Sequence, residues 1–139
     1  MSKWLWLGAT VACAALACGG SSSSGGGTPP KGFYISITNF AYAPQNLQVP
    51  PGATVTVINN DGMQHSVTSE AVSGAFTLGV VAGISFDTQP FVGTATFTVP
   101  ASAANGTVVP YFCTVHKGTM ATPNATITIN SSAQPTTAP

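Results

Sequence analysis

Three side chains that bind soft or borderline metal ions lie close together near the C-terminal end of the chain. Residues 111–120 read YFCTVHKGTM and contain the thiol of Cys113, the imidazole of His116 and the thioether of Met120. The 139-residue sequence has only one other histidine, His65, which lies far upstream. Two imidazoles, a thiolate and a thioether brought to one place would form a site for a transition metal.

The chemistry of these four side chains favours copper. Two His and one Cys in a trigonal plane, with a weakly bound Met on the axis, are typical of copper sites that transfer electrons. Structural zinc sites use four Cys or His ligands and gain little from a thioether. Calcium and magnesium need oxygen ligands, which this set does not offer.

Each residue taken alone has a simpler explanation. Cys113 could be a small buried hydrophobe, and Met120 could fill the core. Either histidine could be an ordinary residue at a strand end or in a turn. Met63 is interpreted as a loop or packing residue, although it could compete with Met120 as an axial ligand. The joint occurrence of these residues in a chain so poor in them is what favours a metal site.

The elements that must position these residues follow from alternating apolar and polar residues between turn residues. We expect strands over residues 33–40, 46–49, 54–59, 65–69, a short one near Ile84–Phe86, 94–99, 107–113 and 125–130. No segment shows a sustained helical period. Seven or eight such strands predict an all-β Greek-key sandwich of antiparallel strands. In such a sandwich, the strand ends that carry the four side chains can meet at one pole.

The composition excludes several classes of function. Charged residues make up 4% of the chain, with three basic and three acidic residues and no Arg. These are too few for a nucleic-acid interface, which needs clustered Lys and Arg. The absence of Arg also argues against bidentate recognition of phosphate or carboxylate groups.

The first residues have the pattern of a leader. Lys3 precedes an apolar run over residues 4–17, which has signal-peptide length and is too short to span a bilayer comfortably. The run ends in AALAC, which resembles the lipobox of bacterial lipoproteins. That resemblance implies a signal peptide over residues 1–17 and lipid attachment at Cys18. Cys13 is an alternative attachment site, and cleavage of an ordinary secretory leader is the alternative to lipidation.

The rest of the chain divides by composition into three parts. Residues 18–31 are rich in Gly, Ser and Pro and predict a lipid-anchored tether. Residues 32–130 are the expected folded domain, and residues 131–139 the expected flexible tail. If Cys18 is lipidated and Cys13 removed, Cys113 is the only thiol left. An intrachain disulfide is then impossible, and a lone thiol in an oxidising envelope needs burial, modification or a metal.

Residues 33–130 resemble a cupredoxin, a small blue copper protein of the plastocyanin, pseudoazurin and amicyanin type. The motif that carries the resemblance is a His on an early strand, His65, followed by CTVHKGTM with Cys-x-x-His and a Met. The stretch APQNLQVPPGATVTVINNDGMQHSV (43–67) is also similar to the family. The resemblance implies one type 1 copper with His65, Cys113 and His116 in the plane and Met120 on the axis.

Two departures from the family pattern concern the surroundings of the metal. Three residues separate His116 from Met120, where relatives commonly have two or four. Ser66 stands where many relatives have an Asn that ties down the Cys loop, so the groups around the ligands are expected to differ. Such changes affect the potential and the spectrum more than copper binding.

The resemblance implies a monomeric electron carrier and not an enzyme. We expect it on the periplasmic side of the bacterial cell envelope, meeting redox protein partners by transient apolar contact. Gly19 after Cys18 is not the Asp often linked to inner-membrane retention, which favours the outer membrane.

Other functions fit the sequence less well. The main alternative is a lipoprotein that binds or delivers copper without transferring electrons. A multicopper enzyme would need more than two His, and a metal-free sandwich for adhesion would leave the four side chains unexplained.

Overall fold

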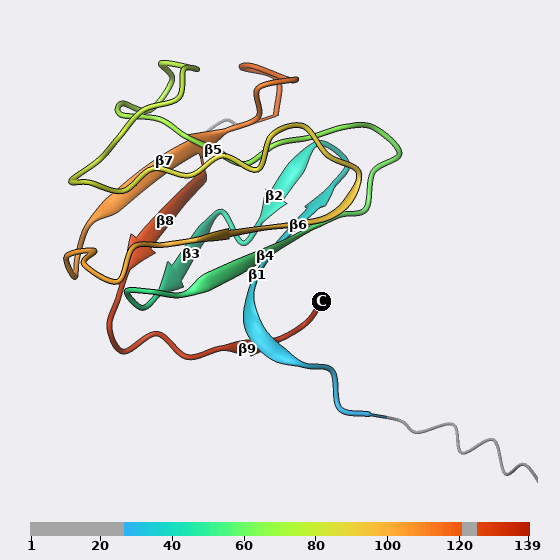
Figure 1. Cartoon of the computed structure of the whole chain (residues 1–139). Coiled ribbons are helices and arrows are strands. Elements are labelled where there is room, and N and C mark those ends of the chain that lie inside the picture. The colour runs from blue at the N-terminus through green and yellow to red at the C-terminus, as the bar shows by residue number, and fades with distance from the viewer. Residues whose placement is uncertain (1–26, 121–124) are drawn as a thin grey trace, which may run out of the picture.

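Nine strands form two sheets in the computed structural model, which describes residues 27–120 and 125–139 (Figure 1). The strands are β1 (Lys31–Thr38), β2 (Ala41–Ala43), β3 (Asn46–Val49), β4 (Thr54–Asn59), β5 (Thr68–Ser69), β6 (Gly93–Thr98), β7 (Val108–Phe112), β8 (Ala125–Ile129) and β9 (Thr136–Thr137). The predicted all-β sandwich is therefore confirmed. Within the described ranges, no helix is long and apolar enough to cross a membrane.

The order of the strands explains how the two sheets are connected. The first sheet has the order β2-β1-β4-β6, with β9 also paired to β1, and the second has the order β3-β8-β7-β5. After the β1–β2 hairpin the chain crosses to the second sheet as β3 and returns as β4 beside β1. The β1–β4 and β3–β8 pairs are parallel, which corrects the expectation of antiparallel strands throughout, while the other strand pairs are antiparallel.

Alternating apolar residues fill the space between the sheets. In β4, Val55 and Val57 are fully buried, and in β8 the same is true of Ile127 and Ile129. Successive side chains of a strand point to opposite faces, so each of these strands places every second residue in the core. The core is continuous up to the end of β7, where Cys113 is one of its members.

The structure differs from the predicted strands in the segment that carries His65. We expected a strand over residues 65–69, but β5 comprises only Thr68 and Ser69. His65 instead forms an isolated antiparallel bridge with Phe91. The region 70–92 is a long connection, as expected, and near Ile84–Phe86 it contains isolated bridges, Val81 with Ile84 and Asp87 with Thr68, in place of a strand.

The two ends of the domain also differ from the expectation. Lys31 already belongs to β1, and the segment 131–139, expected as a tail, contributes β9. Lys31 and Gly32 pair with Thr137 and Thr136, so the C-terminal segment returns beside the start of β1 (Figure 1). The predicted signal peptide and the attachment site at Cys18 lie outside the described residues.

Adjacent valines in β7 offer a matched test of the core. Val109 is fully buried, whereas Val108 is about half exposed. Val109→Ala should lower the free energy of unfolding by about 2 kcal/mol, from about 0.8 kcal/mol for each buried carbon lost and a cavity contribution. Val108→Ala, the same chemical change one residue away, should change it much less. Urea denaturation of both variants measures this, and equal losses would contradict the packing described here.

Candidate metal centre

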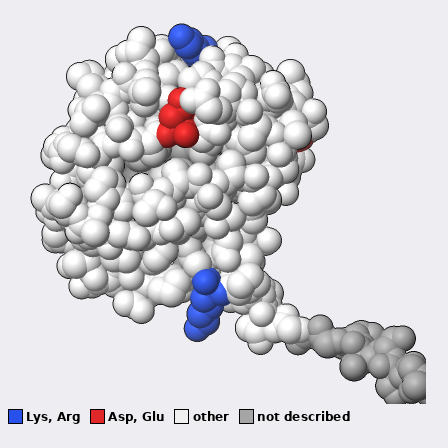
Figure 2. Space-filling model, viewed as in Figure 1, with Lys and Arg blue, Asp and Glu red and all other residues white. Residues whose placement is uncertain are grey.

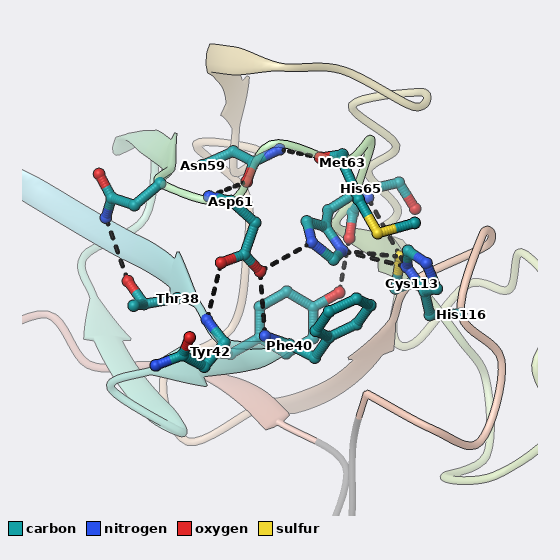
Figure 3. A network of polar contacts seen from close by, with 12 residues as sticks. Thr38, Phe40, Tyr42, Asn59, Asp61, Met63, His65, Cys113 and His116 are labelled. Carbon is teal, nitrogen blue, oxygen red and sulfur yellow. Dashed lines mark hydrogen bonds and ion pairs between the residues drawn. The ribbon is translucent and has the colours of Figure 1, made fainter.

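Three predicted ligands converge at one end of the sandwich (Figure 3). Cys113 directly follows β7, His116 lies in the next turn, and His65 lies in the connection from β4 to β5. Cys113 Sγ is 3.8 Å from His65 Nδ1 and 3.7 Å from His116 Nδ1. The two Nδ1 atoms are 3.1 Å apart. One nitrogen of each ring and the sulfur therefore face a common point.

The backbone of His65 is held on both sides. Its N–H donates to the carbonyl of Phe91 at 3.1 Å, and Phe91 N–H donates back to the carbonyl of His65 at 2.9 Å. The side chain is fully buried, and burial lowers the pKa of the imidazole. A neutral imidazole is the form that binds a metal.

The outer nitrogen of His65 contacts a carboxylate. Nε2 is 3.0 Å from Asp61 Oδ2, four residues earlier in the chain. A carboxylate accepts only, so Nε2 carries the proton and Nδ1 presents a lone pair to the metal. The carboxylate also accepts the backbone N–H groups of Asn39 (2.7 Å) and Phe40 (3.0 Å). The N–H of Phe40, more than any other contact, lowers the pKa of Asp61 and keeps it ionised.

The sulfur of Cys113 lies in a buried and partly polar setting. Only 1% of the residue is exposed, and the backbone N–H of Ser66 donates to Sγ at 3.4 Å. A donor aimed at the sulfur stabilises the thiolate, which is the form that binds metals. The thiolate is thus provided with a hydrogen bond from the segment that carries His65.

Ser66 also connects the two ligand-bearing segments through its side chain. Its hydroxyl accepts the N–H of Thr114 at 2.9 Å and lies 3.0 Å from the hydroxyls of Thr114 and Thr68. The expectation that Ser66 alters the surroundings of the ligands has a defined structural form: a serine hydroxyl ties down the residue after Cys113.

A buried tyrosine forms a hydrogen bond with the same segment. Tyr42 donates its hydroxyl to the carbonyl of Ser66 at 2.5 Å. Burial, with the nearby Cys113 adding to it, raises the pKa of Tyr42 far above its usual range. The phenol therefore stays protonated and remains a donor that holds the backbone next to His65.

The turn after His116 brings Met120 back into the core. The N–H groups of Thr119 and Met120 both donate to the carbonyl of His116, at 3.1 and 3.3 Å. Gly118 has a φ of 72°, which glycine adopts without steric cost. Met120 is buried among the core residues, whereas Met63 is 51% exposed. Because Met120 is buried and Met63 is exposed, Met120 is the better candidate for the axial ligand. The assignment of Met120 as a ligand remains a prediction.

An aromatic ring covers the imidazoles. Phe40 packs edge-on against His65, with ring centroids 5.3 Å apart, and against His116, with centroids 4.9 Å apart. Figure 3 shows Phe40 beside both histidines, and Asp61 on the side of His65 that faces away from His116. The ring shields this side of the ligand cluster from water, while His116 remains partly exposed.

The donor set fits copper on chemical grounds. One sulfur and two imidazole nitrogens, with a thioether nearby in the chain, combine ligands suited to Cu(I) with ligands suited to Cu(II). A structural zinc site would require a fourth Cys or His, and the group found among the described residues contains only His65, Cys113 and His116.

Sequence reasoning missed two residues of this site. The sequence pattern assigns no role to Asp61, and it places Phe40 only at the end of a predicted strand. The available signal for Asp61 was its position four residues before His65 in a chain with three acidic residues. For Phe40 no sequence signal existed, because its contact with the imidazoles depends on how the β1–β2 hairpin bends.

The comparisons with known proteins agree with this geometry. Residues 33–130 match the family model for copper binding proteins of the plastocyanin/azurin family. The structure is similar to that of an oxidised amicyanin variant, with 21% identity over 71% of this chain and 82% of that chain, and a TM-score of 0.51. It is also similar to a purple cupredoxin from Nitrosopumilus maritimus, with 24% identity over 70% of this chain and 99% of that chain, and a TM-score of 0.51. A search of curated protein sequences gave no match.

The hydroxyl of Ser66 can be tested by its removal. Ser66→Ala leaves the N–H of Thr114 without its acceptor in a part-buried site. We expect the free energy of unfolding to fall by about 1–3 kcal/mol, the usual cost of an unsatisfied buried polar group. Ser36→Ala is the matched control, because the Ser36 hydroxyl makes only an exposed contact of 3.4 Å with the Ala43 carbonyl. Thermal or urea denaturation compares the stability of the two variants. Equal stability would show that the hydroxyl of Ser66 does not stabilise the segment that contains Thr114.

Proposed function

Since the chain belongs to the plastocyanin/azurin family of copper-binding proteins, we propose that it carries single electrons at one type 1 copper and is not an enzyme. The convergence of Cys113 Sγ with the Nδ1 atoms of His65 and His116 is the observation that carries this proposal. When bound, copper supplies a one-electron couple between Cu(II) and Cu(I).

The surrounding residues suit electron transfer because they hold the ligands in place before the metal arrives. His65 is held through its backbone by Phe91 and through its ring by Asp61. Cys113 receives the N–H of Ser66. Ligands fixed in this way move little when the charge of the site changes, so little reorganisation accompanies each electron.

His116 is the ligand through which we propose that electrons enter and leave. It is half-buried, whereas His65 and Cys113 are buried. Apolar side chains near it are exposed: Phe40 by 40%, Met63 by 51% and Val115 by 45%. The exposed Lys117 directly follows His116, and the face visible in Figure 2 carries few charged side chains. A partly apolar, weakly charged surface supports brief contacts of small area with redox protein partners.

The proposed setting is the periplasmic side of a bacterial cell envelope. The AALAC pattern supports lipid attachment at Cys18, and the Gly/Ser-rich residues after it would give the domain reach from the membrane. The predicted monomeric state suits a carrier that must exchange partners.

The proposal is tested by adding one equivalent of Cu(II) to the purified domain. We expect an intense visible absorption from thiolate-to-copper charge transfer, narrow copper hyperfine splitting in EPR, and reversible bleaching by ascorbate through many redox cycles. Cys113→Ser should abolish the intense band, because no thiolate remains among the described residues. Oxidation of the thiol without colour in the unmodified protein would contradict the proposal.

Two methionines allow the axial ligand to be identified. Met120→Leu should keep copper and colour but raise the potential, because replacing a donor sulfur by hydrocarbon disfavours the more highly charged Cu(II). A tenfold change in the ratio of Cu(II) to Cu(I) affinity corresponds to about 59 mV for one electron. Met63→Leu makes the same change at the exposed methionine and should leave the potential unchanged. Cyclic voltammetry measures the potential of both variants. A raised potential in Met63→Leu with an unchanged potential in Met120→Leu would assign the axial position to Met63.

A further inference from the structure

We propose that Asp61 is the positioning residue of the copper centre, and that its carboxylate fixes His65 and lowers the potential of the copper. This inference rests on the proposed function, because it concerns the same site. Asp61 lies outside the four predicted ligands, and we expect its carboxylate to have a measurable effect on the metal.

Several hydrogen bonds hold the carboxylate of Asp61 in place. A single carboxylate accepts from His65 Nε2 (3.0 Å), Asn39 N (2.7 Å) and Phe40 N (3.0 Å). Its own N–H donates to Asn59 Oδ1 at 3.0 Å, which fixes the turn in which it lies. Only 12% of the Asp61 side chain is exposed. The carboxylate therefore has a defined position and joins the turn between β1 and β2 to the segment that carries His65.

The contact with Nε2 determines which nitrogen of His65 is available to the metal. With the proton held on Nε2 by the carboxylate, Nδ1 is the unprotonated nitrogen, and Nδ1 is the atom that faces Cys113 and His116. A carboxylate on the outer nitrogen of a metal-binding histidine orients the ring and makes it a stronger donor. Asp61 thus selects the tautomer that the site requires.

The same carboxylate holds the residue that covers the imidazoles. Asn39 and Phe40 have φ values of 52° and 61°, a left-handed conformation that is uncommon for residues other than glycine. Both of their N–H groups donate to Asp61. The turn that Asp61 stabilises is therefore the one that lays Phe40 over His65 and His116.

The charge of Asp61 affects the two oxidation states unequally. A negative group in contact with a ligand stabilises the more positive ion, Cu(II), more than Cu(I). Because the site is largely buried, this interaction is screened less than one between exposed charges. The presence of Asp61 should therefore lower the potential, and loss of its charge should raise it.

The first experiment uses the unmodified protein with diamagnetic Cu(I) bound. Long-range ¹H–¹⁵N NMR should show that His65 carries its proton on Nε2, and that this proton exchanges with water more slowly than the ring N–H of the half-buried His116. A His65 ring without a proton on Nε2, or with exchange as fast as that of His116, would overturn the inference. This result does not depend on the folding of any variant.

The second experiment compares two variants with the same change of charge. Asp61→Asn removes the carboxylate that touches His65, and Asp87→Asn removes one that binds Thr68 and Gln89 instead. We expect Cu(II) affinity to fall by about 10–100-fold in Asp61→Asn, the usual range for such outer partners. Cu(I) affinity should fall less. If the decreases in Cu(II) and Cu(I) affinity differ tenfold, the potential rises by about 59 mV. Asp87→Asn should raise the potential clearly less than Asp61→Asn does.

The outcomes separate this inference from the proposed function. If the unmodified protein binds copper without the thiolate band, both fail. If it shows the band and a reversible potential, but Asp61→Asn and Asp87→Asn shift that potential equally, only the role of Asp61 fails. A selective rise in Asp61→Asn, together with the protected Nε2 proton, supports the inference.

Discussion

The hydrogen bonds between the His65–Ser66 segment and the Cys113–Thr114 segment are the interaction on which the centre depends. These segments are separated by almost 50 residues in the chain and are joined by Ser66 N–H to Cys113 Sγ and by Thr114 N–H to Ser66 Oγ. The pairing of β5 with β7 continues this contact into the second sheet. The connection that carries His65 runs from β4 in the first sheet to β5 in the second, so the same bonds fix this connection where it reaches the second sheet.

A second set of contacts orients the ligands within that frame. Asp61 accepts a hydrogen bond from Nε2 of His65, and the hydroxyl of Tyr42 donates to the carbonyl of Ser66. Each of these groups keeps one ionisation state: the contact with Phe40 N–H keeps Asp61 charged, and burial keeps Tyr42 neutral. The surroundings of the ligands are therefore defined by hydrogen bonds of fixed direction, which a change in the charge of the metal would not reverse.

How far the sequence predicts this structure depends on the range of the interactions involved. The strands at 46–49 and 54–59 follow from local alternation and appear with the expected bounds. The three converging ligands follow from their chemical rarity, because two His and one unpaired Cys leave few combinations. By contrast, β2 and β9 exist through pairing with β1, and His65 is held by a bridge to Phe91 instead of belonging to β5. Such contacts between distant segments have no local pattern to reveal them.

The scarcity of charge gives the remaining charges greater weight. The three acidic residues of the chain are all part of the described domain, and each accepts hydrogen bonds from the backbone. Glu70 binds the N–H groups of Gly74 and Phe76 in the long connection, and Asp87 binds that of Gln89. Asp61 differs because its carboxylate also meets a metal ligand. In a protein with few competing charges, one carboxylate in that position can influence the potential of the centre, while apolar side chains near His116, such as Phe40 and Val115, are exposed for contact.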